Sequence, residues 1–294
     1  MDSISYTGSE SKGLVEILSS TVIWGSIPVF AIWADLPSPV FVFFRVMISA
    51  ILLGLILRKG LKKSLRKLFS PYVLLSGILL SLNWVFLFYA VFMIPVSEAI
   101  IFYYMGPVVA ILLSPFIKEK INGKGYINVF IALVGVIIMS AGTISVNPLG
   151  ILMALMSGIT YGMLSIFSKI SSSNMDAIIL VFLQSVISMI ILSPFMFLLP
   201  FHFDYSVLII VIISGAVQTV LALFLWYDSM RYISIQLVSI LTYLDPVFAI
   251  IFALLLLHQI PGLYALVGAV LLIGSGVWAA SDTIKRKPVV SVIS

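Results

Sequence analysis

Three ionisable residues stand inside or at the start of long apolar stretches of this chain. Arg45 lies within VFVFFRVMISAILL, Asp245 precedes Pro246 in ILTYLDPVFAIIFA, and Glu98 begins a further apolar run. A charged group in hydrocarbon costs about 2.5–3.5 kcal/mol on insertion scales, so each needs a specific reason. Guanidinium groups bind carboxylates and phosphates, and buried carboxylates bind cations or protons. The three residue types therefore fit a site for a small charged molecule.

Each of these residues also has a structural interpretation. Arg45 can reach toward the membrane surface or pair with Glu98 to fix packing. Glu98 suits the first turn of a helix, where an acid complements the helix dipole; its other role is proton coupling. Asp245 can cap backbone groups freed by Pro246, but prolines near the middle of a span are typical of the broken helices at transport sites. We therefore place Asp245 in a cavity and take it as a second candidate for proton coupling.

Neutral polar and aromatic residues recur near the centres of several apolar stretches. Their hydroxyls and ring faces suit small polar or aromatic metabolites and cations. For any one ring the alternative is packing or a belt at the membrane interface. Together with the charged residues, the predicted substrate-binding set is Trp24, Arg45, Asn83, Trp84, Tyr103, Tyr104, Tyr161, Gln218, Tyr243 and Asp245.

Other chemistry finds little support in the sequence. The chain has no cysteine and two isolated histidines, so disulfides and thiolate metal sites are excluded and a histidine metal site is disfavoured. It has no nucleophile with a neighbouring base and no G-x-x-x-x-G-K-[ST] phosphate loop. We expect no cofactor, no metal, no direct use of ATP and no enzymatic activity.

The elements that must position these residues are membrane-spanning helices. The chain is 62% hydrophobic and 9% charged, which fits lipid as the solvent for most of its surface. Apolar runs of about 20 residues, the length of one span, predict an all-α integral membrane protein. These runs start near Leu14, Pro39, Pro71, Val96, Gly125, Pro148, Asp176, Ser206, Ser234 and Gly262.

Basic residues are confined to one side of these ten spans. The loops after the second, fourth, sixth and eighth spans, with the two tails, hold all of the 16 Lys and Arg residues except Arg45. The positive-inside rule then places both termini in the cytoplasm, in a multi-pass protein of the plasma membrane. The net charge of +5 is a topology signal, and we expect no nucleic-acid partner.

The sequence contains the same unit twice. YMGPVVAILLSPFIKEKI from Tyr104 aligns with YLDPVFAIIFALLLLHQI from Tyr243 at an offset of 139 residues, with 6 of 18 positions identical. Further matches lie near the same offset, which chance similarity of apolar sequence explains poorly. We predict a cytoplasmic tail at residues 1–13, five-helix repeats at 14–143 and 148–282, and a second tail at 283–294. Because five is odd, the second copy enters the membrane inverted, which is a transporter architecture.

Several motifs resemble a known family. WG in the first span, FFR in the second, and PVSEA, YMGPVVAIL and KEKI around the fourth resemble the drug/metabolite transporter superfamily, nearest to the EamA-like metabolite exporters. The resemblance implies a ten-helix fold that carries amino acids, aromatic compounds, nucleotide sugars, sugar phosphates or cationic drugs. Members often have Glu at the end of the fourth helix of each half; Glu119 fits, but His258 replaces it in the second half. The four-helix multidrug branch often has a Glu in its first helix, whereas the stretch LSSTVIWGSIPVFAIWA has no acid, which argues against a cationic drug.

We therefore predict a secondary-active exporter of small metabolites such as amino acids, working by alternating access. Its partners would be the small-molecule substrate and the lipid bilayer, with the chain as a monomer or homodimer. The alternatives are a passive facilitator or channel for small solutes, and an importer of phosphorylated or nucleotide-type metabolites.

Overall fold

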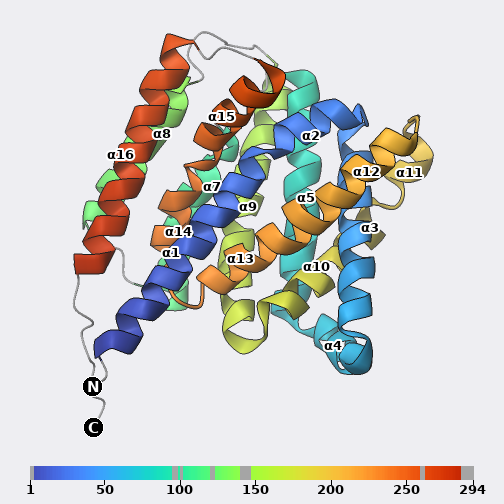
Figure 1. Cartoon of the computed structure of the whole chain (residues 1–294), viewed down its shortest axis with the longest axis horizontal. Coiled ribbons are helices and arrows are strands. Elements are labelled where there is room, and N and C mark those ends of the chain that lie inside the picture. The colour runs from blue at the N-terminus through green and yellow to red at the C-terminus, as the bar shows by residue number, and fades with distance from the viewer. Residues whose placement is uncertain are drawn as a thin grey trace.

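The computed structural model is built from helices (Figure 1) and describes residues 3–94, 99, 102–119, 123–139, 147–258 and 262–285. In chain order its α-helices are α1 (Ser3–Gly25), α2 (Ile27–Ala34), α3 (Ser38–Ile56), α4 (Leu61–Arg66), α5 (Pro71–Met93), α7 (Met105–Leu113), α8 (Gly123–Met139), α9 (Pro148–Asn174), α10 (Ala177–Leu192), α11 (Phe195–Leu198), α12 (Tyr205–Ile213), α13 (Ala222–Ser229), α14 (Ile235–Thr242), α15 (Asp245–Leu257) and α16 (Leu263–Lys285). A π-helix, η4 (Ser214–Leu221), joins α12 to α13, and short 3-10 turns flank α4 and follow α7.

The apolar segments of the structure follow the predicted spans. Within the described residues, six helical segments are long and apolar enough to cross a membrane, and four shorter apolar helices complete the ten. The first helix begins at Ser3, so helical structure extends through most of residues 1–13, the stretch predicted as a cytoplasmic tail. Lys12 on this helix pairs with Glu16 one turn along and with Asp228 of α13, and the second pair ties α1 to α13.

Four spans are interrupted near their middle. α1 ends at Gly25 before Pro28, α7 starts just before Pro107, and α15 starts at Asp245 before Pro246. Proline lacks an N–H and disrupts the helical hydrogen bonds of the preceding turn. The fourth interruption, the π-helix η4, has the same effect without proline, because its wider turn changes which carbonyls are bonded.

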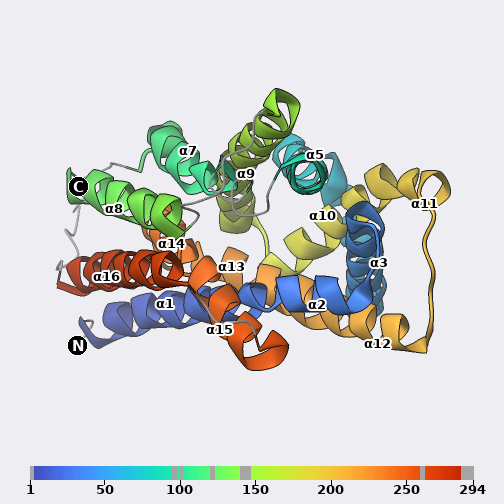
Figure 2. The ribbon, with the colours of Figure 1, turned by 90° about the horizontal axis from the view of Figure 1, so that it is seen from above.

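The helices assemble into two bundles that mix the sequence halves (Figure 2). α1 packs on η4, α13, α14 and α15, which form the α1 bundle; α9 packs on α5 and α7, which form the α9 bundle. α3 packs on α10 between the bundles, and α8 and α16 lie together at one end of the molecule. Exchanging each helix for its repeat partner converts the α1 bundle into the α9 bundle. The contacts therefore have the two-fold symmetry expected of a ten-helix fold made from two five-helix repeats.

Glycines show this symmetry at the level of single contacts. A Cβ placed on Gly25 would lie 2.5 Å from the Cβ of Phe248, and a Cβ on Gly162 would lie 2.5 Å from the Cβ of Val109. Gly162 repeats Gly25 after 137 residues, and Phe248 repeats Val109 after 139. The same glycine-to-side-chain contact thus occurs in both bundles, where it lets two helices approach closely.

Candidate functional site

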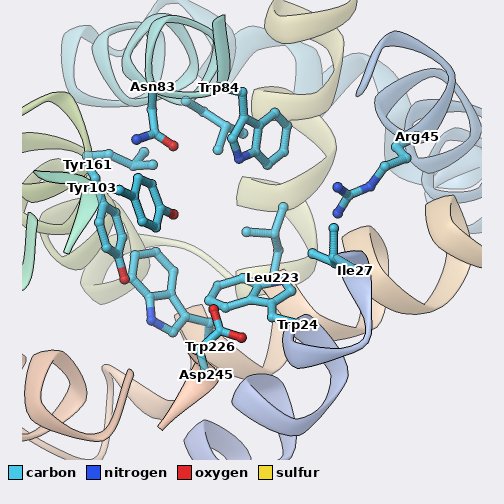
Figure 3. A pocket seen from close by; sticks show the side chains of 12 residues that line it. Trp24, Ile27, Arg45, Asn83, Trp84, Tyr103, Tyr161, Leu223, Trp226 and Asp245 are labelled. Atoms are coloured by element: carbon cyan, nitrogen blue, oxygen red, sulfur yellow. The ribbon is translucent and has the colours of Figure 1, made fainter. Parts of the chain in front are cut away.

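A central cavity lies between the two bundles (Figure 3). Its volume is about 80 Å³. Its wall consists of Trp24, Ile27, Arg45, Leu80, Asn83, Trp84, Tyr103, Tyr161, Leu164, Leu223, Trp226 and Asp245. Both bundles contribute residues, so a molecule bound here would touch each of them.

Arg45 projects from α3 toward this cavity (Figure 3) and is 3% exposed. Its Nε–H donates to Thr219 Oγ1 at 3.2 Å, and Nη2 donates to the carbonyl of Gln218 at 3.3 Å. The guanidinium carbon lies 5.6 Å from the ring centroids of Trp84 and Phe41. No carboxylate pairs with it in the described part of the chain. These contacts hold the cation in place and leave part of its fork for an anionic ligand.

Asp245 supplies a carboxylate at the point where the ninth span is broken. The Tyr104 hydroxyl donates to Asp245 Oδ2 at 3.2 Å, and the Tyr243 hydroxyl donates to the Tyr104 carbonyl at 2.7 Å. Among the residues that the structure covers, no Lys or Arg forms an ion pair with Asp245. The carboxylate is therefore positioned by tyrosines of both halves and has room for a cationic ligand or a proton.

A continuous series of aromatic contacts crosses the gap between the bundles. The ring centroids of Trp24 and Trp226 are 5.7 Å apart, and those of Trp226 and Tyr161 are 6.2 Å apart. Tyr161 stacks on Tyr103 with a centroid distance of 5.1 Å and an interplanar angle of 5°. The ring centroid of Tyr104 lies 5.3 Å from that of Tyr103. Ring faces of this kind bind apolar, aromatic or cationic groups.

Trp226 also carries a buried hydrogen-bond donor. The residue is 2% exposed, and its Nε1 has no hydrogen-bond partner among the residues that the structure describes. Buried donors are almost always paired, so this N–H is an exception among the described residues. Trp24 differs, because its Nε1 donates to the carbonyl of Gln218 at 3.1 Å.

The structure places the ten predicted substrate-binding residues in two layers. The cavity wall includes Trp24, Arg45, Asn83, Trp84, Tyr103, Tyr161 and Asp245. The supporting layer consists of Tyr104, Gln218 and Tyr243, which hold wall residues through hydrogen bonds. Glu98, the other predicted proton-coupling residue, lies outside the described residues.

Two of the predicted residues have their side-chain amides engaged in packing. Asn83 Nδ2 donates to the carbonyl of Ser157 at 2.9 Å, which ties α5 to α9. Gln218 accepts from Ser214 Oγ at 2.5 Å and donates to Ser26 Oγ at 2.8 Å. Gln218 reaches the site through its backbone carbonyl, which the π-helix directs at Arg45 and Trp24.

Several wall residues were not predicted. Ile27, Leu80, Leu164 and Leu223 are apolar, and nothing in the sequence marks them from other apolar positions. Trp226 had a signal, because FLWY near the end of the eighth span repeats FLFY in the third. In the described residues no group of three or more His, Asp or Glu side chains is arranged to hold a metal ion.

Comparisons with known proteins agree with this architecture. The model of the EamA-like transporter family matches twice, over residues 11–141 and 148–280. The uncharacterized transporter YxxF of Bacillus subtilis (strain 168) is 30% identical over 273 residues, covering 90% of this chain and 88% of that protein. The uncharacterized transporter YojE of the same organism is 27% identical over 267 residues, covering 84% and 86%.

A solved crystal structure shares the fold. It superposes with a TM-score of 0.79 at 18% identity and covers 94% of this chain and 98% of the other. The two family matches together span most of the sequence, and each covers one five-helix repeat. The chain is a multi-pass membrane protein and belongs to the EamA-like transporter family.

Proposed function

We propose that this transporter exports small zwitterionic metabolites such as amino acids, by alternating access to the central cavity. The observation that carries the proposal is the presence of Arg45 and Asp245 on different walls of one cavity, each without an ion-pair partner among the described residues. An amino acid carries the complementary pair, with its carboxylate toward Arg45 and its ammonium toward Asp245. The aromatic wall would cover its side chain.

The same charges favour an amino acid over the other substrates considered. A phosphorylated or nucleotide-type metabolite would bring two or more negative charges into a cavity that holds the Asp245 carboxylate. Like charges in a site of low dielectric repel strongly, so a net-neutral ligand fits better. The proposed orientation, with both termini cytoplasmic, follows from the basic loops and makes export the outward direction.

Counterflow in proteoliposomes tests this function. Vesicles preloaded with one amino acid should accumulate the labelled compound transiently, and a panel with sugars and phosphates identifies the preferred class. Arg45→Gln and Asp245→Asn should each lower apparent affinity about tenfold to hundredfold, the scale of one lost charge-assisted hydrogen bond. Asp176→Asn is the matched control, because Asp176 is exposed and makes no side-chain cap bond.

Linear, non-saturating uptake without counterflow would instead support the passive facilitator or channel. Preference for sugar phosphates, with no response to amino acids, would support the importer of phosphorylated compounds.

Proton coupling belongs to the same proposal, with Asp245 and Glu98 as its candidate residues. An inward or outward pH gradient imposed on the vesicles should then drive net transport, and Asp245→Asn should uncouple it while exchange continues. Transport that ignores the gradient would exclude coupling through these residues.

A further inference from the structure

Two charged side chains of the α9 bundle hydrogen-bond to the backbone of the loop that joins α13 to α14 in the α1 bundle. Lys169, near the end of α9, donates through Nζ to the carbonyls of Met230 and Ile233, the second at 2.9 Å. Glu119, just beyond α7, accepts from the backbone N–H of Ile235 at 2.8 Å and lies 3.2 Å from Lys169 Nζ. We call Glu119 and Lys169 the latch.

The latch lies at one end of the cavity. α9 and α13 both end there, on the same side of the molecule as the N-terminus (Figure 1). The basic loops predict that this side is cytoplasmic. The Lys169 side chain is 16% exposed and that of Glu119 is 23% exposed, so water only partly weakens their interaction.

The two latch side chains do not recur at the equivalent positions of the other repeat. By the offsets of the two helices concerned, Ile32 occupies the position of Lys169 and His258 that of Glu119. Ile32 has no charged or donor group and is 56% exposed. A structural requirement shared by both repeats would recur at both ends, so these interactions serve one side of the transporter.

A neighbouring ion cluster differs from the latch in what it connects. Lys12 lies 2.9 Å from Asp228, and Arg231 lies 3.1 Å from the same carboxylate. Lys12 is on α1 and Asp228 on α13, so this ion pair joins two helices of one bundle. It therefore provides a control of similar charge and location that does not bridge the bundles.

We propose that Glu119 and Lys169 fasten the cytoplasmic ends of the two bundles, so that the substrate-free transporter rests closed toward the cytoplasm. Taking up a cytoplasmic substrate then requires release of the α13–α14 loop. This inference rests on the proposed alternating access, but it concerns a conformational equilibrium that exists without any substrate.

Cysteine labelling tests the latch directly, because the chain has no cysteine of its own. Leu164→Cys puts one thiol on the cavity wall, one turn from Tyr161 toward the latched end. Its rate of reaction with a membrane-impermeant methanethiosulfonate is measured from each side, in right-side-out and inside-out vesicles without substrate. Adding Lys169→Met should raise the rate from the cytoplasmic side about tenfold, the effect of one charge-assisted hydrogen bond.

The control is Lys12→Met with Asp228→Asn in the same Leu164→Cys background, which should leave the cytoplasmic rate unchanged. An unchanged rate in the Lys169→Met variant, or an equal rise in the control, overturns the proposal. Should Lys169→Met fail to fold, Glu119→Gln replaces it. This variant keeps an acceptor for the Ile235 N–H, so it should raise the cytoplasmic labelling rate by a smaller factor. No rise in that rate overturns the proposal. A positive labelling result with no amino-acid counterflow would refute the substrate and leave the latch.

Discussion

Arg45 and Gln184 occupy equivalent positions in the two repeats but have different surroundings. Gln184 is fully buried, and its amide donates to Ser76 Oγ at 2.8 Å and Ser168 Oγ at 3.2 Å while its carbonyl accepts from the Tyr227 hydroxyl. The amide and carbonyl groups of Gln184 therefore form their hydrogen bonds within the protein. Arg45 keeps part of its fork directed at the cavity, so the comparison separates a packing residue from a binding residue.

Substitution at these two positions should have opposite consequences. Gln184→Leu removes the buried hydrogen bonds to Ser76, Ser168 and Tyr227 and should lower the free energy of unfolding by about 1–3 kcal/mol. Arg45→Gln should keep the thermal midpoint in detergent close to that of the wild type and weaken ligand binding. Loss of binding with full stability in Gln184→Leu would reverse the two assignments.

The buried Nε1 of Trp226 leads to a second prediction at this scale. Trp226→Phe removes an N–H that has no partner among the described residues, so stability should change little beyond the loss of ring volume, while the smaller ring on the cavity wall lowers ligand affinity about threefold to tenfold. Trp24→Phe removes the bond to the Gln218 carbonyl and should reduce thermal stability more than Trp226→Phe does. Equal effects of the two variants on affinity and stability would contradict this division.

The sequence predicted where these residues lie along their spans better than where their side chains point. Gln218 was placed correctly near the middle of its span, but its side chain turns to Ser26 and Ser214 instead of the cavity. Spans that are apolar on every face carry no periodic signal of which face lines a cavity. That rotation is set by packing against helices of the other repeat.

Interrupted helices, at the scale of elements, bring backbone groups to the cavity. The break at Asp245 could be predicted from Pro246, and the break after Gly25 is close to Pro28. The π-helix η4 could not, because its sequence SGAVQTVL contains no proline. Close contacts with α3 shape this segment; a Cβ on Gly215 would lie 2.5 Å from the Cβ of Ile48.

Close approach of helices at glycine also makes a prediction. Gly25→Ala would place a Cβ 2.9 Å from the backbone nitrogen of Ala249, which cannot move independently of α15, and should destabilise the protein by about 1–3 kcal/mol. Gly274→Ala is the control, because outside its own stretch of helix no described residue has an atom within 4 Å of its added Cβ. That variant should be neutral or stabilising by up to about 1 kcal/mol in thermal unfolding. Destabilisation by both to the same extent would contradict the packing described.

The whole molecule consists of two bundles, each composed of helices from both repeats. The sequence predicted two paired halves but not these bundles, because sequence repeats do not specify which helices associate. The structure gives the partners: the first helix joins the eighth and ninth, and the sixth joins the third and fourth. Movement of one bundle against the other would alter the cavity from both ends, since the wall is shared between them.

The central claim is that one cavity binds a zwitterion between Arg45 and Asp245. Three of the five tryptophans line that cavity, so intrinsic fluorescence can report ligand binding. The most direct test titrates the best amino acid of the panel, its methyl ester and its N-acetyl derivative into wild type, Arg45→Gln and Asp245→Asn.

Esterification should weaken binding to the wild type about tenfold or more and have little further effect in Arg45→Gln. N-acetylation should likewise weaken binding to the wild type and have little further effect in Asp245→Asn. Full additivity, with each ligand change costing as much affinity in its matched variant as in the wild type, would contradict the claim.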